Sequence, residues 1–254
     1  MFSLVAKAVR NPRRALRRIC SMAGNILGRK KGVLIYIGLH KGRTFQQIFR
    51  QYRACYGFEA NPEVFRELEE EYREYPHVHL FNVAVADFDG EVTFNISSND
   101  GASSSIGNFD DNWEGYRSRL VTMTKTIKVP SINLLSFCRR HRIDYIDDYV
   151  SDIQGMDLQV LKTMRPFIER RRIGTITCET TKDGKPNIYM DLPDNTESGF
   201  RELLTDNYKL VARGWGRLEE GVFSDVPEEW WEMDCKWRAK TCALPPSRPR
   251  TTSR

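Results

Sequence analysis

The sequence lacks an apolar run approaching the roughly 18–20 residues that cross a bilayer, so no segment predicts a membrane-spanning helix. Its six cysteines are scattered and include no C-x-x-C pair. Neither a disulfide framework nor a metal site is therefore predicted. Reduced thiols in a cytosol-like compartment are expected, and with them a cytoplasmic location or a peripheral position on a membrane.

Acidic residues are absent from the first part of the chain, where Glu59 is the first to occur. Thirteen basic residues precede it, namely Lys7, Arg10, Arg13, Arg14, Arg17, Arg18, Arg29, Lys30, Lys31, Lys41, Arg43, Arg50 and Arg53. The whole sequence holds 39 basic and 34 acidic residues, so the remainder of the chain is net acidic. All the surplus positive charge therefore lies at the N-terminal end.

Residues 1–31 form a basic arm ahead of the main domain. Asn11 and Pro12 predict a helix start, with Asn as the N-cap and Pro at the first helical position. Apolar residues then recur on one face, at Leu16, Ile19, Cys20, Ala23, Ile26 and Leu27. Three hypotheses stay open: a helix on an anionic membrane or protein partner, a helix packed on the domain, or a targeting peptide.

From Val33 the pattern alternates between apolar strands and amphipathic helices, which predicts βαβ units and a mainly parallel sheet. The expected strands are residues 33–37, 54–60 and 77–85, a further strand that a turn at Asp89-Gly90 leads into within 87–96, and then 126–130, 147–153 and 173–179, followed by closing strands within 210–237. The expected helices follow Gly42, begin at Asn61-Pro62, and span 131–141 and 155–168. We expect one α/β domain over residues 32–240, with a functional loop or lid at 97–124 and a disordered end at 241–254.

Polar residues follow several of the expected strands. The first ends in Gly38-Leu39-His40-Lys41-Gly42, and carboxylates close the strands 54–60, 147–153 and 173–179 at Glu59, Asp152 and Glu179. Ligands in such sheets bind outside the carboxyl ends of the strands. Glu59 stands about twenty residues after the glycine turn, where a carboxylate accepts both ribose hydroxyls of an adenosine. The fingerprint G-x-G-x-x-G and the Walker sequence are both absent, which disfavours NAD and ATP and leaves S-adenosylmethionine (SAM).

Four stretches, in order over about residues 33–180, resemble motifs of the FkbM-type family of SAM-dependent O-methyltransferases, which act mostly on sugar hydroxyls. "IYIGLHKGRT" resembles the glycine loop D-V-G-A-N-x-G-x-x-T, and "GFEANPEVFREL" resembles F-E-P-N-P-x-x-x-x-x-L. "NVAVADFDGEVTF", followed by "GASSS", resembles N-x-A-x-x-x-x-x-G-x-x-x-F, and "YVSDIQGMDLQVLKTM" resembles K-I-D-x-E-G-x-E-x-x-V-L-x-G. The resemblance implies a Rossmann-like class I methyltransferase fold with a seven-stranded, mainly parallel sheet and helices on both faces.

The resemblance also implies roles for single residues. Gly38 and Gly42 would form the turn under the methionine moiety, Glu59 would hold the ribose, Asn82 and Ala84 would border the adenine, and Asp152 would stand beside the sulfonium and the acceptor. The cofactor site is completed by Tyr36, His40, Lys41, Thr44, Asn61 and Ser104. Tyr36 and His40 replace the Asp and Asn of the family loop, and Gln154-Gly155-Met156-Asp157 replaces E-G-x-E. A working cofactor loop, a degenerate fold kept for binding and an unrelated turn are all hypotheses at this point.

Methyl transfer to a sugar hydroxyl requires alignment and a base. Asp152 is the first candidate base, followed by His40 and Glu179, and a divalent ion bridged by Asp152 and Glu179 is an alternative. A sugar or glycan acceptor would contact residues 97–124 and 181–195. In these segments Trp113, Tyr116 and Tyr189 offer rings that could stack on the sugar. The tryptophans nearer the C-terminus, Trp230, Trp231 and Trp237, are assigned to the core or a lid. The rival hypotheses are an RNA methyltransferase that uses the basic arm, which the acidic body disfavours, and a catalytically inactive interaction protein.

Overall fold

The computed structural model describes residues 30–113, 117, 118, 120–214, 218–223, 227, 228 and 231–240. The predictions for residues 1–29 of the arm, for Tyr116 and Trp230, and for the end at 241–254 lie outside the described residues.

A seven-stranded sheet forms the centre of the described molecule, in the order β11-β12-β9-β8-β1-β2-β3. Its strands are β1 (Lys31–Ile37), β2 (Tyr52–Phe58), β3 (Val78–Phe81), β8 (Ile146–Ser151), β9 (Ile173–Thr181), β11 (Tyr208–Gly214) and β12 (Glu232–Ala239). Strands β3, β2, β1, β8 and β9 are parallel, and β12 is antiparallel to both β9 and β11. The prediction of a mainly parallel seven-stranded sheet is confirmed.

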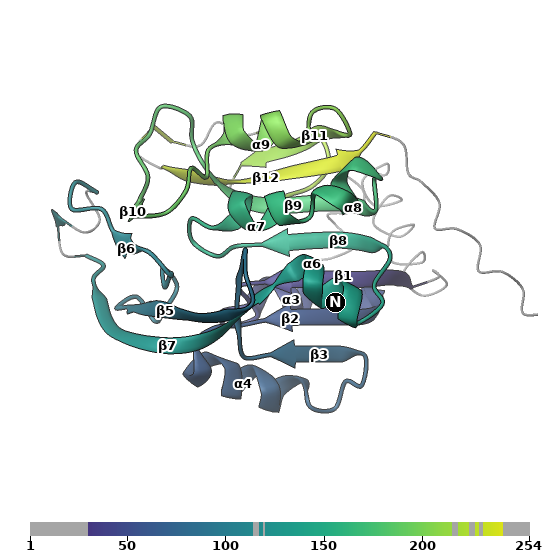
Figure 1. The fold of residues 1–254 in the computed structure, drawn as a ribbon, viewed down its shortest axis with the longest axis horizontal. Coiled ribbons are helices and arrows are strands. Elements are labelled where there is room, and N and C mark those ends of the chain that lie inside the picture. The colour runs from purple at the N-terminus through teal and green to yellow at the C-terminus, as the bar shows by residue number, and fades with distance from the viewer. Residues whose placement is uncertain are drawn as a thin grey trace, which may run out of the picture.

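The strand order reverses at β1, because the chain first adds β2 and β3 on one side and later β8 and β9 on the other. In Figure 1 the arrowheads of β2, β3 and β8 point toward the side where two smaller sheets lie. Ligand sites of open parallel sheets lie at such a reversal, at the carboxyl ends of the strands. The topology therefore places the candidate site beside the loop that follows β1.

Helices cover both faces of the sheet. Helices α3 (Arg43–Ile48) and α4 (Pro62–Tyr72), with the short 3-10 turn η1 (Phe49–Gln51), pack on one face through a cluster that includes Leu34, Phe45 and Leu68. Helices α6 (Leu134–Arg140), α7 (Asp157–Thr163), α8 (Arg165–Glu169) and α9 (Glu197–Leu204) contribute to a larger core with Ile35 and Tyr149. No helix within the described residues is long and apolar enough to cross a membrane.

Two smaller sheets stand at the carboxyl edge of the main one (Figure 1). The first has the order β4-β7-β5 and consists of β4 (Ala84–Ala86), β5 (Gly90–Ser97) and β7 (Met123–Asn133). The second pairs β6 (Asn108–Phe109) with β10 (Tyr189–Met190). The predicted loop at 97–124 therefore contains β6, and the predicted strand 126–130 extends over eleven residues.

Two predicted elements are wrong in extent. The strand predicted over 77–85 is divided into β3 and β4, because Asn82 turns the chain there and donates from Nδ2 to the carbonyl oxygens of Glu59 at 2.9 Å and Ala60 at 3.2 Å. The helix predicted over 155–168 is divided at Met164 into α7 and α8, since Pro166 lacks the N–H that a continuous helix requires.

Candidate active site

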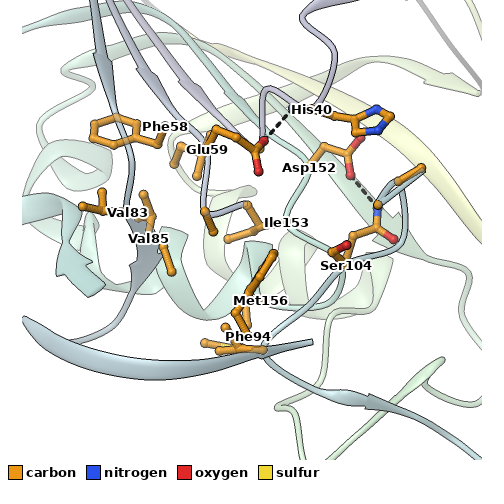
Figure 2. Close-up of a pocket in the computed structure, with 18 residues that line it drawn as sticks. His40, Phe58, Glu59, Val83, Val85, Phe94, Ser104, Asp152, Ile153 and Met156 are labelled. Carbon is orange, nitrogen blue, oxygen red and sulfur yellow. Dashed lines mark hydrogen bonds between the residues drawn. The ribbon is translucent and has the colours of Figure 1, made fainter. Parts of the chain in front are cut away.

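A cavity of about 170 Å³ opens at the carboxyl ends of β1, β2 and β8; we call it the strand-end cavity. Figure 2 shows His40, Glu59 and Asp152 at its polar end, whereas the apolar side chains gather elsewhere along its wall. The apolar wall consists of Phe58, Val83, Ala84, Val85, Phe94, Ile106 and Met156. The cavity thus combines an apolar slot with carboxylates, a combination suited to a ligand that has a flat ring at one end and charged groups at the other.

Gly38 lies where the loop after β1 meets the end of β8. Its φ of 77° is left-handed, and a Cβ added there would stand 1.9 Å from the carbonyl oxygen of Asp152. The Gly38 N–H donates to the carbonyl oxygen of Phe58 at 3.0 Å, which joins the same loop to β2. Only glycine fits this position, because both the backbone conformation and the contact exclude a side chain.

Glu59 follows the last residue of β2 and is buried against the floor of the cavity. Its carboxylate accepts from the backbone N–H of His40 at 2.7 Å and from that of Asn61 at 2.8 Å. Burial raises the pKa of Glu59, and these two N–H donors oppose that rise. The two donors orient the carboxylate, and each oxygen keeps a lone pair for a ligand hydroxyl.

Of four further predicted cofactor residues, Ala84 and Ser104 line the cavity, whereas Asn82 and Asn61 do not. Ala84 lies in the apolar wall. Ser104 lies at the edge formed by residues 97–105, which we call the serine-rich loop. The Asn82 side chain fixes the turn between β3 and β4 instead, and Asn61 caps α4 by accepting from Glu63 N–H at 3.0 Å. Both asparagines therefore stabilise the backbone beside the cavity without lining it.

His40 and Lys41 connect the glycine loop to the serine-rich loop through Asp100. His40 has a left-handed φ of 46°, and its Nε2 lies 2.9 Å from the carbonyl oxygen of Asp100. Because a carbonyl only accepts, Nε2 carries the hydrogen, and Nδ1 is then an acceptor if the ring is neutral. Lys41 Nζ lies 2.7 Å from Asp100 Oδ2, and this contact lowers the pKa of the exposed Asp100 carboxyl. Lys41 itself does not line the cavity.

Asp152 and Glu179 are joined by one side-chain amide. Gln154 Nε2 donates to Asp152 Oδ1 and to Glu179 Oε2, each at 2.7 Å. Its carbonyl oxygen accepts from the hydroxyl of Tyr189 at 2.5 Å. The carboxylates that end β8 and β9 therefore belong to one hydrogen-bonded network.

Asp152 and Glu179 differ in how readily each carboxyl group loses its proton. Burial raises the pKa of Glu179 well above its ordinary value, and the Asp152 carboxylate raises it further. Burial also raises the pKa of Asp152, whereas hydrogen bonds from Gln154 and Glu179 lower it. The Asp152 side chain is exposed within its cavities and that of Glu179 is only 8 % exposed, so water solvates charge on Asp152 more readily. Of the two carboxyls, Glu179 therefore holds its proton more tightly than Asp152.

A second cavity, of about 440 Å³, lies against the sheet on the face covered by α3; we call it the sheet-face cavity. Asp152 lines both cavities, and Glu179 lines only this one. Tyr36 and Thr44 also line the sheet-face cavity, and the Tyr36 ring packs edge-on against Phe45 at 5.7 Å. Tyr36 thus lines the sheet-face cavity and not the strand-end cavity.

Gly42 is the N-cap of α3, has a φ of 67°, and lines neither cavity. A Cβ there would lie 2.9 Å from Leu68 Cδ2, so the glycine serves the turn and the packing of α3 on α4. Within the described ranges, no three His, Cys, Asp or Glu side chains gather as metal ligands.

The methyltransferase FkbM domain family matches residues 37–203. This chain belongs to that family. It is a SAM-dependent methyltransferase with a Rossmann-like fold. A search of curated proteins finds no match to the chain.

Solved structures similar to this FkbM-domain methyltransferase include three other methyltransferases. N-methyltransferase NodS from Bradyrhizobium japonicum WM9, with S-adenosyl-L-homocysteine, has 11% identity and a TM-score of 0.42 over 92% of this chain and 91% of that one. Magnesium protoporphyrin IX methyltransferase ChlM from Synechocystis PCC 6803, with bound SAM, has 7% identity and a TM-score of 0.42 over 89% and 78%. The 23S rRNA methyltransferase ErmE has 14% identity and a TM-score of 0.39 over 90% and 68%. These values give no information on the acceptor.

The strand-end cavity of the FkbM-domain methyltransferase fits the chemistry of SAM. Gly38 lets the loop after β1 approach the end of β8 and lines the cavity, Glu59 offers a carboxylate to a ribose diol, and the apolar wall suits an adenine ring. The carboxyl of Asp152, which loses its proton more readily than that of Glu179, suits the positive charge of the sulfonium and amino groups. The residues that would hold the cofactor are thus those of the cavity wall.

Several residues of the site were not predicted as part of it. Gln154 was noted only as a departure from the family, although its position two residues after Asp152 at a strand end could have indicated it. Phe94, the last residue of the quoted stretch "NVAVADFDGEVTF", and Met156, quoted only as part of Gln154-Gly155-Met156-Asp157, enter the apolar wall from β5 and from the turn before α7, although neither was assigned to the site. Tyr189, predicted as a ring for stacking, is buried beside Phe109 at 5.5 Å and joins the network through its hydroxyl.

Proposed function

We propose that the enzyme methylates a hydroxyl of a sugar or glycan and that Asp152 is the general base. The observation that carries this proposal is the position of Asp152, whose exposed carboxylate lies in the wall common to the two cavities. When bound, SAM supplies a methyl group to an in-line displacement, in which the acceptor oxygen gains the bond that the sulfur loses. Asp152 then takes the hydroxyl proton, which avoids a charged oxonium product.

The other predicted catalytic residues have supporting roles in this proposal. Burial and the neighbouring Asp152 carboxylate raise the pKa of Glu179, so it donates or positions rather than acting as the base. His40 holds the serine-rich loop through the hydrogen bond from Nε2 to Asp100. Only its Nδ1 is left to accept a proton, so His40 ranks behind Asp152 as a candidate base. Polar side chains around Asp152 favour a polyhydroxylated acceptor over an apolar one, because hydroxyls can replace the water that these groups would otherwise bind.

A methyl-transfer screen tests the proposal. The full chain is incubated with SAM that carries a radiolabelled methyl group, together with separate pools of glycans, lipids and RNA. The expected product is a methyl ether on a glycan. Label that appears in RNA alone, or on nitrogen alone, would overturn the proposed acceptor class and leave the cofactor assignment intact.

A further inference from the structure

Gln154 occupies the centre of the polar network without any assigned role. Its side chain is only 9 % exposed although it lines the strand-end cavity. Every hydrogen-bonding atom of its amide is used: both N–H groups by Asp152 and Glu179, and the carbonyl oxygen by Tyr189. The orientation of the amide is fixed by these partners, because the carboxylates need donors.

The backbone around Gln154 is shaped to bring this amide to the strand end. Gln154 has a φ of 57° and Gly155 a φ of 101°, so two consecutive residues adopt left-handed conformations. A Cβ on Gly155 would lie 3.0 Å from both Leu192 Cδ1 and the ring of Tyr189. The hydroxyl of Ser105 donates to the carbonyl oxygen of Gln154 at 2.8 Å and secures the turn from the opposite loop. A non-glycine residue in this conformation costs on the order of 1 kcal/mol, so the packing around it must hold it there.

We infer that Gln154 is the positioning residue for Asp152 in methyl transfer, and this inference rests on the proposed function. One amide bonds both carboxyl groups at equal distance, which fixes the Asp152 carboxylate at the boundary between the cavities. The Gln154 amide stabilises the ionised form of Asp152, the form that accepts a proton. Glutamate in its place would offer at most one donor for the same two carboxylates, so the departure from the family motif has a chemical consequence.

The protonation of the pair is measured on the free, full-length protein by the pH dependence of carboxyl ¹³C signals in NMR. The groups that bear on the pair are Glu232 and Asp234 from β12, Asp157 from α7, and His40 from the loop after β1. In the unmodified protein Asp152 is expected to lose its proton at lower pH than Glu179. In Gln154→Leu, which removes both donors at similar size, the Asp152 titration is expected to move up by about one pH unit or more.

Gln159→Leu is the matched control, because Gln159 donates to Asp87 Oδ2 at 3.0 Å in an exposed Gln–Asp pair outside the site. It is expected to leave the Asp152 titration unchanged. If Gln154→Leu fails to fold, Gln154→Glu decides, since a third carboxyl in the network raises the same titration. An unchanged Asp152 titration in a folded Gln154 variant overturns the inference.

A kinetic measurement separates positioning from a purely structural role. On an acceptor found in the screen, Gln154→Leu is expected to lower kcat by about tenfold or more with a small change in KM for SAM, and to shift the pH profile upward. A rise in KM for SAM with unchanged kcat would overturn the positioning role. The NMR titration needs no acceptor, so a failed screen counts against the proposed function alone.

Discussion

The carbonyl oxygen of Asp152 lies 1.9 Å from the point that a Cβ on Gly38 would occupy. The cofactor loop and the strand that carries the proposed base are therefore in backbone contact. Any side chain at position 38 must push the two apart, which displaces Asp152 from the cavity.

Gly38→Ala is expected to destabilise the fold, and Gly184→Ala is its matched control. The two glycines have similar φ values, 77° and 81°, so the conformational penalty of alanine is nearly equal at both. Gly184 has nothing within 4 Å of its added Cβ. Thermal unfolding should show an additional loss of about 1–3 kcal/mol for Gly38→Ala, the usual cost of overpacking. Equal losses of stability in the two variants would show that the backbone at Asp152 moves aside without a measurable cost.

Glu59→Gln is expected to weaken SAM binding by about 10- to 100-fold, because a hydrogen bond to a charged group contributes about 1.5–3 kcal/mol. The amide keeps the size of the side chain and can still accept from the N–H of His40 or Asn61. Isothermal calorimetry with SAM provides the measurement, and Glu67→Gln on the exposed face of α4 provides the control. Undiminished affinity in folded Glu59→Gln would remove this carboxylate from the cofactor site.

The stability of the protein is expected to fall as the pH rises from about 4 to 7, in part because of Asp157. Burial raises the pKa of this fully buried carboxyl to about 7 from an ordinary value of 3.8. Between these values the folded state binds a proton that the unfolded state has lost, so deprotonation favours unfolding. The contribution is about 1.4 kcal/mol per pH unit within that window and is constant above it.

Asp157→Asn tests this dependence. Asparagine still accepts from the Ser151 hydroxyl, which lies 2.5 Å from Asp157 Oδ1, but it has no proton to lose. Urea unfolding at several pH values should show a flatter stability profile between pH 4 and 7 than that of the unmodified protein. Identical slopes for the two proteins would mean that Asp157 does not carry the proton.

The basic arm is expected to attach the protein to anionic membranes. Deletion of residues 1–31 removes nine basic residues and no acidic one, leaving a net acidic chain. Vesicles that contain an anionic lipid should sediment with the full chain at low salt and not with the shortened one. Equal sedimentation of both chains would exclude the arm as the membrane anchor and favour the other hypotheses for it.

Much of the sheet could be predicted from the sequence, because its signals are local. Apolar runs such as Val33–Ile37 predict buried parallel strands, and Glu59 and Asp152 end their strands where the pattern places them. The helix cap at Asn61 could also be predicted, because Asn-Pro is typical of a helix start. The Asn61 side chain does accept a hydrogen bond from Glu63 N–H. These features depend on a few neighbouring residues.

The remaining features depend on contacts between distant segments. Phe94 reaches the cavity because β5 pairs with β7, a register that no local pattern specifies. The orientation of Tyr36 follows from the aromatic packing of Phe45 beneath it. Gln154 bridges two carboxylates because its backbone is left-handed, a conformation that sequence favours for glycine and not for glutamine.

Single-turnover methyl transfer by Asp152→Asn, at saturating SAM and with the glycan acceptor from the screen, tests the central claim most directly. Asparagine keeps the size of the side chain but cannot take the hydroxyl proton, and Asp144→Asn at an exposed site serves as the control. The account predicts a rate lower by about 10²-fold or more, with an unchanged melting temperature and little change in SAM affinity. A rate close to that of the unmodified enzyme would contradict the role of Asp152 as the base.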